Sequence, residues 1–274
     1  MANTPRFPGA VLNASSVAAP NRRDRVLIAS CIVLITVLSW AYLLHLSRQA
    51  SSSVEADTMM EKMGMVMNQP WSLREVGLTF GMWAVMMVGM MTATALPVLL
   101  LFAGAHGHRG KRGVRLAVAL FGLGYITVWL GFSAFAAAAQ WGLHQAALLS
   151  STMATSSTPL AGGILIAAGA YQLTPLKRGC LIRCQSPLGY LMSSWRDGAG
   201  GALRMGLRHG AFCLGCCWAL MGVLFVVGVM NLAWVGVLTA FILVEKLGST
   251  GARVSRAGGA ILIAFGVILV SRLT

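Results

Sequence analysis

Five cysteines and one histidine fall into two short groups in a chain that is otherwise strongly apolar. The groups are Cys180/Cys184 and His209/Cys213/Cys216/Cys217. Residues three or four apart lie on one face of a helix, so the second group can point its side chains at one spot. A thiolate is costly in an apolar environment unless a soft metal ion or a disulfide removes its charge. The spacing therefore predicts a functional thiol site, with the alternative that these buried cysteines only pack as small hydrophobic residues.

Two groups of methionines provide a second source of sulfur. One lies in a polar segment and the other in an apolar run: Met59, Met60, Met63, Met65 and Met67, then Met82, Met86, Met87, Met90 and Met91. At about 100° per residue, the tightest stripe on one helix face is Met82, Met86 and Met90. We treat Met59, Met60, Met63, Met87 and Met91 as accessory positions. The alternative is that methionine fills irregular gaps between helices.

These ligands fit Cu(I) best, because thioethers select Cu(I) and thiolates also bind it. Zinc is the alternative metal, since thiolates bind zinc as well. We predict that the polar-segment methionines capture Cu(I), that the stripe relays it, and that the Cys/His cluster receives it. Transport, delivery to a maturing enzyme and sensing all fit this pattern. A metallochaperone or a metalloenzyme client is the expected protein partner.

Charged residues surround the first cysteine pair. Lys177, Arg178 and Arg183 are expected to lower the cysteine pKa and favour the thiolate. Glu245 ends a later apolar run beside Lys246, and an ionisable residue there is either an interface residue or an accessory member of the site.

The composition places the chain in a membrane. Of its 274 residues, 57% are hydrophobic and only 10% are charged, whereas soluble domains carry about 25% charged residues. We therefore expect an all-α, polytopic transmembrane helical bundle. The net charge of +14 could indicate nucleic acid, but the basic residues lie in short blocks between apolar runs, as the positive-inside rule requires. The expected partner is the lipid bilayer and not nucleic acid.

Residues 1–25 are polar and are expected to be a disordered cytoplasmic tail, followed by a single transmembrane domain over 26–274. Runs of about the length needed to cross a bilayer predict seven spans, at about 26–46, 76–104, 114–140, 159–177, 210–229, 231–247 and 257–272. The count falls to six if 229–234 is not a turn. Most of the 21 Lys and Arg residues lie inside if the N-terminus is inside, which predicts an N-in, C-out topology. Both cysteine groups then lie at the cytoplasmic end, joined by a basic loop at 178–209.

The sequence carries no paired carboxylates within a span, no nucleophile–base motif and no phosphate-binding loop, so we do not expect an enzyme. Two rivals to metal binding remain. One is a membrane thiol–disulfide redox protein that uses the Cys-x-x-Cys at 213–216. The other is a membrane scaffold or assembly subunit without a metal.

Several stretches resemble a bacterial family of predicted metal-binding integral membrane proteins of unknown function. The matching stretches are 83–91 with Pro97, 171–177 with Cys180 and Cys184, 210–221, 230–232 and Glu245-Lys246. The resemblance covers about 75–250 and implies a small multi-pass protein of the bacterial inner membrane with a metal site. It does not imply a substrate or an activity.

Overall fold

The computed structural model describes residues 20–62, 71–108, 113–148, 154–248 and 250–272, and every regular element within these ranges is a helix. The helices are α1 Arg22–Lys62, α2 Leu73–His108, α3 Val114–Gln145, α4 Thr158–Gln172, α5 Pro175–Gln185, α6 Pro187–Ser194, α7 Ala199–Gly222, α8 Leu224–Val227, α9 Leu232–Leu247 and α10 Gly251–Ser271. Because α1 begins at Arg22, the end of the expected tail is helical, and residues 1–19 of that tail lie outside the described residues.

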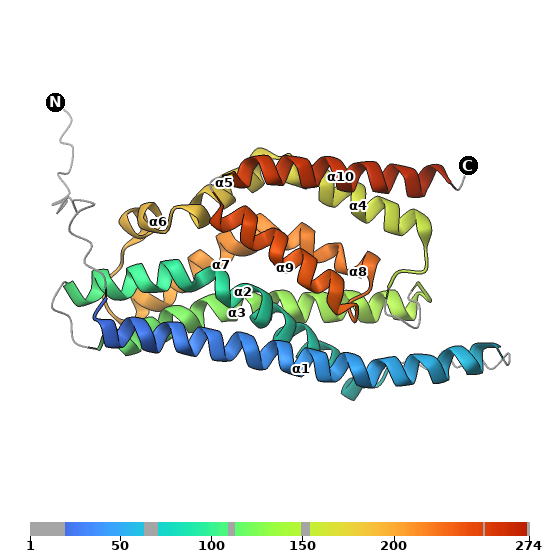
Figure 1. The fold of residues 1–274 in the computed structure, drawn as a ribbon, viewed down its shortest axis with the longest axis horizontal. Helices are drawn as coiled ribbons and strands as arrows, with labels where there is room; N and C mark the ends of the chain where they lie inside the picture. Colours follow the sequence, from blue (N-terminus) through green and yellow to red (C-terminus); the bar gives the residue numbers. More distant parts are fainter. Residues whose placement is uncertain (1–19, 63–70, 109–112, 149–153, 249, 273–274) are drawn as a thin grey trace, which may run out of the picture.

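Five helical segments are long and apolar enough to cross a membrane, which identifies a membrane protein: Arg22–Gln49, Leu73–Gly107, Val114–Gln145, Ala199–Val227 and Gly251–Ser271. The helices α4 and α9 are apolar but have 15 and 16 residues, fewer than the about 20 that span a bilayer. These seven elements alternate in direction along the bundle, and α1 begins at the end opposite to that where α10 finishes (Figure 1). The seven-span count and the N-in topology stay predictions.

The expected basic loop at 178–209 is instead helical, so that prediction was wrong. It forms most of α5, all of α6 and the first turns of α7, which begins at Ala199 and not at 210. Proline opens both short helices, at Pro175 and Pro187, a position where its missing N–H is not needed. The Oγ1 of Thr174 caps α5 by accepting a hydrogen bond from the backbone N–H of Lys177 at 3.3 Å. Because α5 begins as a new helix at Pro175, α4 ends at Gln172 and does not reach residue 177.

The chain also breaks where the turn at 229–234 was in question. Here α8 ends at Val227 and α9 begins at Leu232. Gly228 has φ 90°, a left-handed conformation that glycine adopts without a steric penalty. The apolar run after α7 is therefore divided into separate helices.

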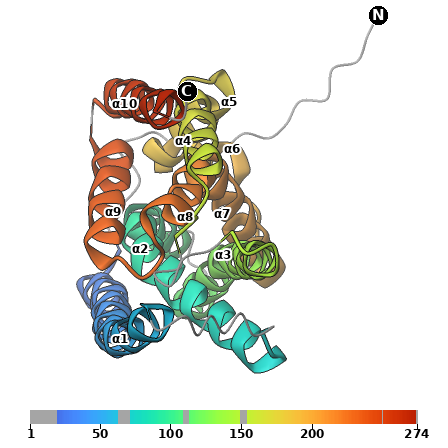
Figure 2. The ribbon, with the colours of Figure 1, turned by 90° about the vertical axis from the view of Figure 1, so that its right-hand side faces the viewer.

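The bundle is arranged around α2. Viewed along its length, α2 crosses the middle, with α1, α3, α7 and α9 around it and the α4/α10 pair beyond α7 (Figure 2). The contact between α3 and α7 is close because Gly124 and Gly206 face the other helix's backbone. A Cβ at Gly206 would overlap the carbonyl of Phe121, and one at Gly124 would overlap the carbonyl of Leu203. This approach brings the middle of α3 against the cysteines of α7.

Candidate metal centre

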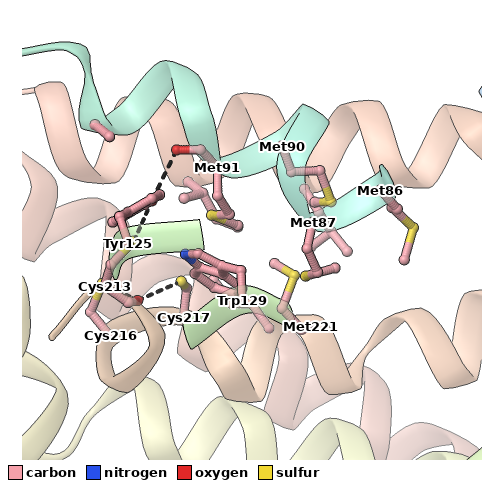
Figure 3. Packing of buried hydrophobic residues seen from close by; sticks show 14 of the residues in the cluster. Met86, Met87, Met90, Met91, Tyr125, Trp129, Cys213, Cys216, Cys217 and Met221 are labelled. Atoms are coloured by element: carbon pink, nitrogen blue, oxygen red, sulfur yellow. Dashed lines mark hydrogen bonds between the residues drawn. The ribbon is translucent and has the colours of Figure 1, made fainter. Parts of the chain in front are cut away.

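The three cysteines of α7 lie on one face of the helix, as their spacing predicted. Their side chains are buried at 1%, 0% and 0% exposure for Cys213, Cys216 and Cys217. The thiols of Cys216 and Cys217 both donate to the carbonyl oxygen of Cys213, at 3.1 and 2.8 Å (Figure 3). All three cysteines are therefore buried in the interior of the bundle, and two of their thiols are held against the α7 backbone.

The second cysteine group reaches the first from α5. The sulfurs of Cys184 and Cys216 are 3.9 Å apart. Cys180 packs over Gly215, where an added Cβ would lie 2.9 Å from its sulfur. Every cysteine of the chain is a free thiol. The two groups thus meet at one place, which is the geometry that a shared site needs.

A lysine ammonium completes this cluster. The Nζ of Lys246, at the end of α9, donates to the sulfur of Cys213 at 2.8 Å and lies 3.7 Å from that of Cys217. The hydroxyl of Tyr125 lies 3.0 Å from the Cys213 sulfur and donates to the carbonyl of Met91 at 3.0 Å. The predicted site included neither Lys246 nor Tyr125. The sequence held one sign of this role for Lys246: it is a charged residue in the last turn of an apolar helix, where a buried charge needs a partner.

Glu245 faces a different set of partners. Its carboxylate oxygen lies 2.6 Å from the Lys177 ammonium, and both side chains are almost fully buried. Lys177 also donates to the side-chain carbonyl of Gln172, and the hydroxyl of Ser255 donates to the Gln172 backbone oxygen at 3.2 Å. At the end of α9, the Lys246 side chain therefore contacts the thiols, whereas the Glu245 side chain forms a separate ion pair with Lys177.

The expected effect of the basic residues on the cysteine pKa was wrong for Cys180. Burial raises the pKa of its thiol, and the nearby sulfur of Cys216 adds to the increase, while the Arg183 guanidinium opposes both. Arg183 is exposed, so water screens its charge. Lys177 is turned away toward Glu245.

His209 lies one turn before Cys213, within a shell of aromatic rings. Its ring centroid is 6.1, 5.9 and 5.0 Å from those of Phe121, Tyr125 and Tyr190. The side chain is buried, and its Nδ1 makes no hydrogen bond. The structure therefore packs His209 beside the thiol cluster, and its role as a ligand stays a prediction.

The methionines of α2 face the bundle interior. Met82 is 6% exposed, Met86 1%, and Met87, Met90 and Met91 are 0%. In Figure 3 the labelled methionines of α2, Met91, Met90, Met87 and Met86, follow one another along the bundle away from the cysteines, and Met87 and Met221 of α7 point toward each other. The helix runs unbroken through Pro97. Met59 is 65% exposed near the end of α1, whereas the Met60 side chain and Met63 lie outside the described residues.

No group of three or more His, Cys, Asp and Glu side chains is arranged to hold a metal ion within the described ranges. The thiols are gathered, and Lys246 occupies a place among them. Thiolates are ligands for a soft ion such as Cu(I) or zinc. The arrangement therefore offers sulfur ligands and a fixed positive charge at one buried position.

Comparison with known families adds an independent finding. Residues 80–269 match the sequence model of the PpoB2 family, which is described as a copper chaperone family. The match includes both cysteine groups, Lys246 and the methionines of α2, and it supports the resemblance to a metal-binding family. Neither a curated protein nor a solved structure matches the chain.

Proposed function

The chain belongs to the PpoB2 copper chaperone family, and we propose that it is an integral membrane protein of the bacterial inner membrane that binds Cu(I) and delivers it to a copper-requiring protein. One observation carries this proposal. Free thiols from two separate segments, α5 and α7, meet in the bundle interior beside a core lined with methionine. We assign the bound ion to the sulfurs of Cys213 and Cys217, which lie together at Lys246, and we assign Cys216 and Cys184 as the thiols through which it leaves. Such a carrier has no catalytic step.

The methionine-lined core supports Cu(I) over a harder ion. A thioether is a neutral ligand, so it can be buried in an apolar core without the cost of burying a charge. Met91 lies at the cysteine end of the labelled α2 methionines, and Met87 and Met221 lie further along the bundle (Figure 3). We propose that these side chains hold Cu(I) weakly on its way to the thiols.

The client would receive the ion at α5. Cys180 and Cys184 are partly exposed, whereas the three thiols of α7 are fully buried. An ion held by Cys216 can pass to Cys184, whose sulfur is 3.9 Å away, and from there to a thiol or thioether of the client. This face of α5 also carries the exposed Arg178 and Arg183, so an acidic surface on the client would be complementary to it.

Anaerobic Cu(I) titration against a chromophoric chelator, on protein purified in detergent, tests the proposal. We expect stoichiometric binding by the native protein. The double change Cys213→Ser/Cys217→Ser should weaken Cu(I) binding by about 100-fold or more. Loss of a residue that only supports a metal ligand costs up to about 100-fold in affinity, so loss of two ligands should cost at least as much. The control is Cys31→Ser, an exposed cysteine of α1, which should bind like the native protein. Equal binding by the double variant would contradict the assignment, and preferential binding of zinc would replace the metal.

The 3.9 Å between the sulfurs of Cys184 and Cys216 also favours a second candidate, a thiol–disulfide redox protein. Small local movements could bring these sulfurs to bonding distance. Alkylation of thiols in growing cells before lysis separates the two. A copper chaperone should show both cysteines reduced, and a persistent Cys184–Cys216 disulfide would favour the redox role.

A further inference from the structure

Lys246 occupies an unusual position for a lysine. Its side chain is only 5% exposed, although lysines near the end of a membrane helix normally extend their ammonium to water. The carboxylate next to it in the chain does not neutralise it, because Glu245 pairs with Lys177 at 2.6 Å. Its nitrogen instead lies against the sulfurs of Cys213 and Cys217, at 2.8 and 3.7 Å.

A buried ammonium without a negative partner is strongly destabilising. Interaction with the carbonyl end of α9 would explain a lysine in this turn, but it would not require the side chain to enter the thiol cluster. The position is accounted for if the cluster carries negative charge when the protein performs its function.

A thiolate site that holds Cu(I) would carry such a negative charge. Two thiolates with one Cu(I) carry one net negative charge, and a buried net charge must be compensated. We infer that Lys246 is the fixed counter-charge of Cu(I) bound by Cys213 and Cys217, and that it makes these two sulfurs selective for a monovalent ion. This inference rests on the proposed function and adds the basis of its metal selectivity.

The preference for a monovalent over a divalent metal ion follows from the same count of charges. Two thiolates with Cu(I) and Lys246 are neutral together. Two thiolates with a divalent ion are already neutral, and Lys246 would leave an uncompensated positive charge beside the metal. Lys246 therefore favours Cu(I) and opposes a divalent ion on the same pair of sulfurs.

The test compares two metals on one protein. Cu(I) and Zn(II) dissociation constants are measured by chelator competition, anaerobically and in detergent, for the native protein and for Lys246→Leu, which removes the charge and adds no sulfur ligand. We expect Lys246→Leu to weaken Cu(I) binding by at least about tenfold, or about 1.4 kcal/mol, while Zn(II) binding is unchanged or tighter. Lys246→Arg keeps the charge and should retain the native preference for Cu(I).

An exposed cation provides the matched control. Arg183→Leu removes one positive charge from α5 near Cys184, but this charge is in contact with water and should affect the Cu(I)/Zn(II) ratio little. An equal loss of both metals in Lys246→Leu would mean that Lys246 only supports the structure, and an unchanged ratio would also overturn the inference. Failure of the native protein to bind Cu(I) would instead refute the proposed function itself.

Discussion

The thiol cluster and the methionine core are both buried and both rich in sulfur, yet they are built differently. Around the cysteines, α5, α7 and the end of α9 bring together thiols, the Lys246 ammonium and the Lys177–Glu245 ion pair. Along α2, the five methionines are surrounded by other apolar side chains. On the function proposed above, this difference matches two tasks: firm binding by charged and compensated ligands at the thiols, and passage along neutral ligands in the apolar core.

The largest expected change in stability comes from breaking the buried ion pair in the charged region. Lys177→Met leaves the Glu245 carboxylate buried without its partner and should destabilise the protein by about 3–5 kcal/mol. The double change Lys177→Met/Glu245→Leu removes both charges and should be much closer to the native stability. Thermal or denaturant unfolding in detergent measures both variants. Equal destabilisation by the single and the double change would show that the ion pair is not what makes this region sensitive.

A smaller effect is expected at the contact that positions the cluster. Gly206→Ala places a methyl group against the backbone of Phe121 and should cost about 1–3 kcal/mol by overpacking. It should also weaken Cu(I) binding, since it pushes Tyr125 away from Cys213. Gly222→Ala is the matched control, because nothing lies within 4 Å of a Cβ at that position. Similar unfolding curves for the two variants would contradict the close approach of α3 and α7.

The smallest change in stability is expected in the methionine core. Replacing Met82, Met86 and Met90 with leucine keeps volume and apolarity, so each change should cost less than about 1.5 kcal/mol. Copper accumulation or delivery in cells should still fall, because the thioethers are lost, while Cu(I) affinity measured at the thiols should hold. Unchanged copper handling in a well-expressed triple variant would return these residues to packing alone.

The sequence was sufficient where helical geometry alone decides the outcome. The spacing of Cys213, Cys216 and Cys217 predicts one face, and the methionines of α2 share a buried face of their helix. It was insufficient for contacts between distant segments. The direction of Lys246, the separation of Glu245 from the thiols and the aromatic shell of His209 depend on how α3, α5 and α9 pack on α7.

The error at 178–209 has a local cause. Its basic and glycine residues resemble a loop, but Thr174-Pro175 and Ser186-Pro187 start new helices there. Those helices bring Cys184 back to Cys216, so the missed secondary structure is also what closes the site.

The most direct test of the central claim is X-ray absorption at the copper edge of the purified, anaerobically loaded protein. We predict a first coordination shell of sulfur alone, with the sulfur signal lost in the Cys213→Ser/Cys217→Ser variant and retained in Cys31→Ser. A first shell dominated by nitrogen or oxygen, or an unchanged sulfur shell in the double variant, would contradict binding of Cu(I) by the buried thiols.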